Sequence, residues 1–135
     1  MSEQEIRDIC KEYGIVKYII NPDGSIDVDG DVDLSDMNLT ELSIKFNRVS
    51  GSFYCYSNNL KTLKGSPNYV GGDFSCSLNN LTSLEGSPEI IYGTFYCGGN
   101  PLESFEGYNS SYDKIINTNK EKLVRKTKLK LIENL

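Results

Sequence analysis

The sequence predicts an α+β repeat solenoid. It is a single domain of stacked parallel β coils with an N-terminal helix and β-hairpin as a cap and a C-terminal helix. The main observation is the motif Phe-x-Cys-x-x-Asn-x-Leu-x-x-Leu-x-Gly, which recurs at a fixed step of 21 residues. A period of this length is typical of units that bury one face against their neighbours. The matching columns are Phe53, Phe74 and Phe95; Cys55, Cys76 and Cys97; Asn58, Asn79 and Asn100; and Leu60, Leu81 and Leu102.

The chain of 135 residues divides into three parts within this domain. Residues 1–25 are expected to form a helix and hairpin cap, residues 26–107 about four repeats, and residues 108–135 a basic cap or tail. Met37 stands where the first repeat should carry its Asn. Altered chemistry in a terminal repeat is expected of a cap.

The N-terminal cap carries clear start and stop signals. Ser2-x-x-Glu5 has the pattern of a capping box, and Gly14 supplies a stop, so we expect a helix from Glu3 to Tyr13. A turn signal follows at residues 21–24, Asn-Pro-Asp-Gly. Apolar residues then alternate with aspartates over residues 26–34, which predicts the half-buried second strand of a hairpin.

Within each repeat, alternation predicts one strand followed by a turn and a return segment. Val70-x-Gly72-x-Phe74-x-Cys76 is expected to point these four residues inward. The Asn of the motif follows at the turn, where its amide can bond backbone groups of neighbouring coils. Equivalent strands are expected to pair in parallel at about 4.8 Å.

The C-terminal part breaks the period and is basic. Residues 113–135 hold seven Lys or Arg against three Asp or Glu, a net charge of +4. Because the whole chain carries −5, the remaining residues carry −9. Thr118-x-x-Glu121 resembles a capping box and predicts a helix, although residues 128–131 would also suit a strand.

Composition argues against catalysis and against metal or cofactor binding. The chain has no His, which is the commonest general base and metal ligand. The Cys column is expected to be buried and reduced, because in-register strands keep thiols about 4.8 Å apart, too far for disulfides. The chain also shows no CxxC pair for zinc. No long apolar run or leader occurs, so we expect a cytoplasmic protein without membrane contact.

An acidic ladder, Asp27-x-Asp29-x-Asp31-x-Asp33, lies on one side of the predicted first-repeat strand. A calcium-binding EF-hand loop needs Gly at its sixth position, which is Val32 here, so calcium is disfavoured. We expect these carboxylates to keep the sheet soluble and to attract a partner with a basic surface.

The outward strand positions vary between repeats and include four tyrosines. Tyr is enriched at binding hot spots, and small residues beside it leave room for a partner. The alternative is that Tyr merely suits strands. We expect a partner-binding face formed by Tyr54, Tyr56, Ser75, Ser77, Tyr92, Tyr96, Asp29, Asp31 and Asp33.

The segment Phe74-x-Cys76-x-x-Asn79-x-Leu81-x-x-Leu84 resembles the core of a leucine-rich repeat, most closely the bacterial short-repeat type. Repeats of this form are also similar to those of small proteins encoded by tailed bacteriophages. The likeness covers about Ile26 to Gly107. It implies a curved solenoid that binds proteins on its sheet face and has no catalytic residues. The first apolar position of that family is occupied irregularly here.

These observations favour a non-enzymatic protein–protein interaction module. The phage resemblance implies an accessory protein that acts in the host cytoplasm and blocks a host defence protein by occlusion. Two alternatives stay open: a self-associating structural protein, and a nucleic-acid binder that uses the basic C-terminal segment. Nucleic acid is the weaker alternative, because no aromatic residue for base stacking lies among those lysines.

Overall fold

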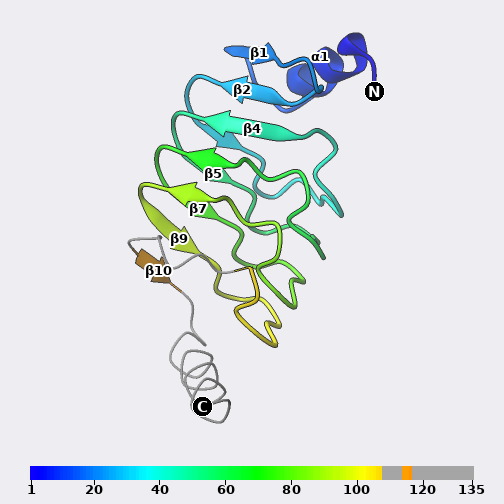
Figure 1. Ribbon diagram of the computed structural model, residues 1–135. Coiled ribbons are helices and arrows are strands. Elements are labelled where there is room, and N and C mark those ends of the chain that lie inside the picture. The colour runs from blue at the N-terminus through cyan, green and yellow to red at the C-terminus, as the bar shows by residue number, and fades with distance from the viewer. Residues whose placement is uncertain (108–113, 117–135) are drawn as a thin grey trace.

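A computed structural model describes residues 1–107 and 114–116, which form a β-solenoid of about three turns with a helix at its N-terminal end (Figure 1). The elements in chain order are α1 (Glu3–Glu12), β1 (Tyr18–Ile20), β2 (Ile26–Val28), β3 (Val32–Asp33), β4 (Phe46–Val49), β5 (Phe53–Tyr54), β6 (Tyr69–Val70), β7 (Phe74–Ser75), β8 (Ile90–Ile91), β9 (Thr94–Tyr96) and β10 (Lys114–Ile116). We refer to residues 26–46, 47–67, 68–88 and 89–107 as the first to fourth coils.

Each of these coils contributes one strand to each of two sheets. Sheet A has the order β1-β2-β4-β6-β8, and sheet B has the order β10-β9-β7-β5-β3. Only the β1–β2 pair is antiparallel among the described strands. In sheet B, Phe53 pairs with Phe74 and Phe74 with Phe95, so the 21-residue period is the register of the stack. The predicted parallel solenoid is thereby confirmed.

The expectation of one inward-facing strand over Val70–Cys76 was wrong. That stretch is two short strands, β6 and β7, joined by a corner at Gly71 and Gly72. A Cβ at Gly71 would overlap the carbonyl of Ser50 in the coil before it. The glycines therefore mark a close approach between neighbouring corners and do not fill an inward strand position. The same corner divides the first coil into β2 and β3, so the predicted long strand over residues 26–34 is also two strands.

The core is a set of identical side chains stacked one coil upon the next. Phe53, Phe74 and Phe95 are fully buried, with ring centroids 5.6 and 5.3 Å apart along the column. Phe46 extends the column and meets Phe53 edge-on at 4.9 Å. Burying an aromatic side chain of this size contributes about 1.5–3 kcal/mol. The Cys column and the Leu residues of the second and third coils are buried beside them.

The Asn column joins neighbouring coils from inside the turn, as predicted. The Nδ2 of Asn79 donates to the carbonyl oxygens of Cys76, in its own coil, and of Cys55, in the coil before, both at 3.0 Å. Its Oδ1 accepts the Leu60 backbone N–H at 2.9 Å. Asn58 and Asn100 make the equivalent bonds. Because each amide reaches back one coil, the first coil has no coil to reach, which explains why Met37 can replace Asn there.

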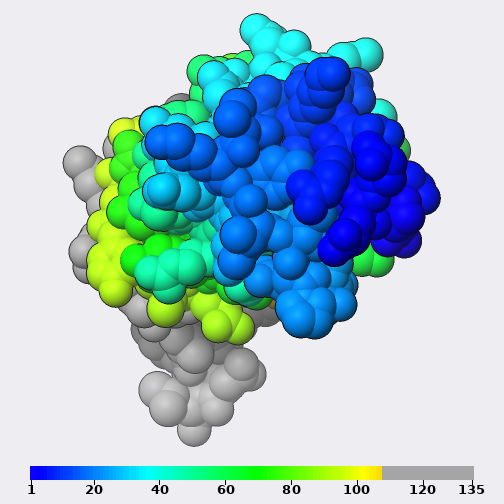
Figure 2. All heavy atoms as spheres, turned by 90° about the horizontal axis from the view of Figure 1, so that it is seen from above, coloured from blue at the N-terminus to red at the C-terminus, as the bar shows by residue number. Residues whose placement is uncertain are grey.

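Helix α1 and the β1–β2 hairpin cover the N-terminal end of the stack (Figures 1 and 2). The helix has the predicted capping box: Ser2 Oγ accepts the Glu5 N–H at 3.1 Å, and Glu5 accepts the Ser2 N–H. Ile6 and Cys10 bury the inner side of the helix against the core. The predicted hairpin is confirmed, with Tyr18 paired to Val28.

At the other end, β10 pairs in parallel with β9 and extends sheet B by one strand. The predicted C-terminal helix, and its strand alternative at residues 128–131, lie outside the described residues. Among the described residues, no helix has the length and apolar character needed to cross a membrane.

Candidate partner-binding surface

The outer side of sheet B positions two of the predicted tyrosines side by side. Backbone alternation turns Phe53 and Cys55 into the core, where both are 0% exposed, so Tyr54 and Tyr56 point outward. Their rings meet edge-on with centroids 6.1 Å apart. Tyr54 is half-buried and Tyr56 is exposed. The pair forms an aromatic ridge on the second coil.

Parallel pairing arranges the outer residues of sheet B in rows that run along the stack. Tyr54 is in register with Ser75, and Ser75 is in register with Tyr96. Ser75 is only 6% exposed, because its small side chain lies between positions that carry large rings. Ser75 therefore contributes little contact area of its own. What the serine provides is a low point between two tyrosines.

A second row runs beside the first, where the chain leaves sheet B. By the 21-residue period its members are Ser35, Tyr56, Ser77 and Gly98. Ser77 is half-buried, and its Oγ is 3.5 Å from that of Ser75. In the first row Ser75 separates two tyrosines, and in the second row Tyr56 stands between Ser35 and Ser77. The flat part of this surface spans about five residues by four strands, on the order of 300 Å² from strand spacing and rise.

The predicted aspartates do not share one flat face, because the glycine corner separates them. Asp29 and Asp31 flank the corner at Gly30, and Asp33 lies in β3. Asp31 Oδ1 accepts the Ser52 backbone N–H at 2.7 Å. Asp33 accepts from the Ser35 N–H at 3.0 Å. Asp29 accepts from the Ser50 hydroxyl at 3.3 Å. All three aspartates are exposed.

The placement of Tyr92 corrects the predicted face. Tyr92 follows β8 and meets Tyr69 of sheet A edge-on at 5.5 Å, so it does not join the sheet B tyrosines. The Arg48 guanidinium carbon lies 3.8 Å from the centre of the same Tyr69 ring, in cation–π geometry. Sequence reasoning missed Arg48 and Tyr69. Their 21-residue spacing was the signal that could have placed them in one row.

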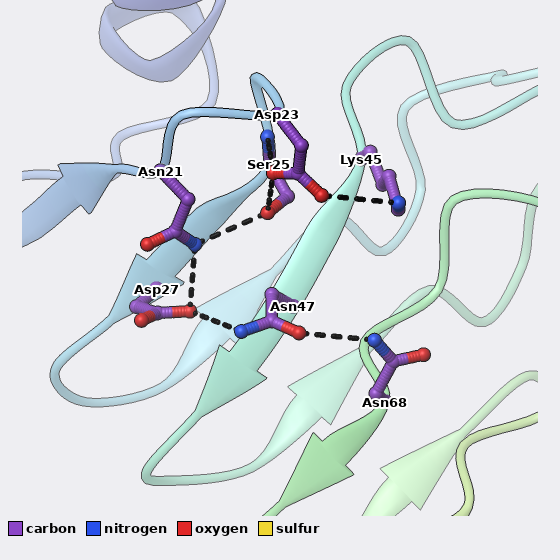
Figure 3. Close-up of polar contacts among 7 residues, drawn as sticks. All are labelled: Asn21, Asp23, Ser25, Asp27, Lys45, Asn47 and Asn68. Atoms are coloured by element: carbon purple, nitrogen blue, oxygen red, sulfur yellow. Dashed lines mark hydrogen bonds and ion pairs between the residues drawn. The ribbon is translucent and has the colours of Figure 1, made fainter.

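A chain of polar contacts on the sheet A side was also missed (Figure 3). Asp27 Oδ1 accepts from Asn21 Nδ2 at 3.1 Å and from Asn47 Nδ2 at 2.9 Å. Asn68 Nδ2 then donates to Asn47 Oδ1 at 3.0 Å. Asn47 and Asn68 are one period apart, so this is a second amide ladder that joins coils. In the same region, hydrogen bonds from Ser25 and the nearby Lys45 ammonium lower the pKa of Asp23 to about 2.

The thiol column has the properties of structural cysteine. Burial raises the pKa of Cys55 and of Cys97 to about 12, and burial together with the two flanking thiols raises the pKa of Cys76 well above its usual value. The thiolate is the reactive form of cysteine, so these side chains are poor nucleophiles at neutral pH. All four cysteines are free and buried.

Carboxylates and thiols are potential metal ligands. In residues 1–107 and 114–116, no group of three or more Cys, Asp or Glu side chains is arranged to hold a metal ion. The polar atoms of the surface are instead engaged with backbone groups of adjacent coils. The geometry offers a contoured contact surface. No protein-family profile, curated protein or solved structure matches this chain.

Proposed function

We propose that this chain is a non-enzymatic protein-binding module and that the outer face of sheet B is its contact surface. One observation carries the proposal. The side chains inside the coils repeat from coil to coil, whereas the outward row Asp33, Tyr54, Ser75 and Tyr96 changes at every coil. Packing explains the repeated positions. Recognition of a partner explains large aromatic residues that packing does not require.

Electrostatics would add steering to this contact. Residues 1–107 carry −9, and the first coil places Asp31 and Asp33 exposed beside the tyrosine rows. Such a surface accelerates encounter with a basic partner. The resemblance to phage-encoded repeat proteins extends the proposal: the partner would be a host defence protein, blocked by occlusion in the host cytoplasm.

Alanine substitution tests the proposed surface. Tyr54→Ala with Tyr96→Ala should abolish capture of protein from a host lysate, read by mass spectrometry, while thermal unfolding changes little because both rings lie outside the core. The matched control is Tyr69→Ala with Tyr92→Ala on sheet A, which should leave capture unchanged. Capture that survives the sheet B pair and is lost in the sheet A pair would move the site to the other sheet. Capture unaffected by either pair would reject both faces.

A further inference from the structure

We propose that the outer face of sheet B binds the same face of a second copy of this chain. The two copies are related by a two-fold axis that runs parallel to the strands, between the second and third coils. This inference rests on the proposed function, because it gives the same surface a further occupant, a second copy of this chain. An axis of this kind makes an isologous contact, in which one patch recognises itself.

The axis determines which residues meet. A rotation about the strand direction keeps each row in place but reverses the order of the coils. The second coil of one copy therefore faces the third coil of the other, and the first coil faces the fourth. Tyr54 then faces Ser75 of the second copy, and Tyr56 faces Ser77 of the second copy. Both of these pairs set a large side chain against a small one.

Shape is the first argument for this register. Ser75 is a low point, 6% exposed, between positions that carry tyrosines in the adjacent coils. A tyrosine ring from another copy fits a low point and would collide with another ring. Moving the axis to the third coil would set Tyr54 against Tyr96, large against large. Only the axis between the second and third coils pairs both tyrosines of the ridge with serines.

Leu78 supplies an independent observation on the same surface. It is 59% exposed and has a φ of +54°, a conformation that disfavours a bulky side chain. The equivalent positions in the other coils are Asp36, Ser57 and Gly99, which are smaller. The proposed axis sets Leu78 against Ser57 of the second copy, again large against small. A contact with a second copy gives this exposed, unfavourable leucine a role.

Local polar pairing is compatible with the same arrangement. The first coil carries Asp31 and Asp33, and across the axis these carboxylates face Thr94 and Tyr96 of the fourth coil, which are uncharged. The Tyr96 hydroxyl can donate to the Asp33 carboxylate.

The size of the face sets the expected affinity. Two faces on the order of 300 Å² bury less than half of the roughly 1,600 Å² of a standard complex. We therefore expect a weak, reversible dimer with a dissociation constant in the micromolar range or above. High salt should strengthen it, because each copy carries a net charge of −5 and screening weakens the repulsion between the two copies.

Sedimentation equilibrium of the full chain over a concentration series tests the inference. We expect a monomer–dimer equilibrium. Ser77→Arg should fill the site opposite Tyr56 and weaken the dimer at least tenfold. The control is Thr82→Arg, an exposed residue on the segment that returns to sheet A, which should dimerise as the wild type does. A wild-type monomer at every concentration, or equal dimerisation of both variants, would overturn the inference.

Cross-linking tests the register. The four native thiols are buried, so introduced surface thiols can be oxidised selectively. A mixture of Tyr56→Cys and Ser77→Cys proteins should form a disulfide-linked heterodimer. A mixture of Tyr56→Cys and Ser35→Cys should form much less, because those positions lie two coils apart across the axis. Equal yields would contradict the proposed axis.

The two proposals fail in different ways. A wild-type monomer that still captures another protein through Tyr54 and Tyr96 would overturn self-association and leave the binding surface in place. A dimer that is unaffected by Ser77→Arg, with capture insensitive to Tyr54→Ala, would reject the sheet B face for both roles.

Discussion

The inside of the coils and the outside of sheet B follow opposite rules. Inside, Phe, Cys and Asn occupy equivalent positions in the second, third and fourth coils, and all are buried. Outside, the residue at one position is Asp33, Tyr54, Ser75 or Tyr96, depending on the coil. The inside Phe residues and the outside residues Tyr54, Ser75 and Tyr96 are direct neighbours on the same short strands. The difference therefore reflects what each side contacts.

Each buried residue of a column packs against the equivalent residues of the neighbouring coils. Because these neighbours are the same in every coil, the same residue type fits each position. Asn shows this most clearly, because one amide bonds its own coil and the coil before it. The outside residues meet solvent or another molecule, and the stack imposes no common choice on them. In a solenoid, the positions where the repeat fails are therefore the positions where function is to be sought.

The largest effect on the free energy of unfolding is expected when the side-chain amide of one buried Asn is removed. Asn79→Ala leaves the buried Leu60 N–H without its acceptor. It also removes one of two amide donors from the carbonyls of Cys55 and Cys76, which keep their bonds from Asn58 and Asn100. An unsatisfied buried group costs about 1–3 kcal/mol and a lost hydrogen bond about 0.5–1.5 kcal/mol, so we expect the free energy of unfolding in urea to fall by about 2–4 kcal/mol. The exposed neighbour is the control: Asn80→Ala should change it by less than about 0.5 kcal/mol. Similar losses in both variants would show that the ladder is not what joins the coils.

The second test uses pH to probe the buried thiols. The pKa of Cys55 is raised from about 9 to about 12, because burial disfavours the thiolate. Below pH 9 the thiol is protonated in both states. Between pH 9 and 12 it ionises only in the unfolded chain, so the unfolding free energy falls as pH rises.

Comparing urea unfolding at pH 8 and pH 10 isolates this effect. The wild type should lose about 1 kcal/mol more than Cys55→Ala over that interval. Tyrosine ionisation affects both proteins alike and cancels in the comparison. An equal loss in the two proteins would indicate that Cys55 is already accessible to water in the folded state.

The stacking of the coils could be predicted from sequence because each buried column is occupied by one residue type at a fixed step. The glycine corner could not be predicted in this way. The apolar alternation continues through Val70, Gly72 and Phe74, and a two-residue alternation alone does not distinguish one straight strand from two strands joined by a bend. The signal lay in Gly71 and Gly72 together, since two adjacent glycines permit a close approach between coils.

The candidate surface was predictable only in part, for the same reason. Tyr54 and Tyr56 follow the corner, and alternation correctly places them outward. Tyr92 precedes the equivalent corner in its coil, so it points from the sheet A side toward Tyr69. Whether a small outward residue is open or covered depends on the coils beside it. The burial of Ser75 between tyrosine positions required the register of three strands.

The smallest expected change is an increase in the free energy of unfolding, and it concerns the exposed Leu78. Its left-handed backbone conformation costs a bulky L-residue about 1 kcal/mol, and Asn adopts that conformation more readily. Leu78→Asn should therefore raise the free energy of unfolding by about 0.5–1 kcal/mol while it weakens any contact made through sheet B. Val16→Asn is the control, because Val16 is 84% exposed and does not have a positive φ. A loss of stability in Leu78→Asn would mean that this leucine serves packing between the coils, and the position would then belong with the inside residues.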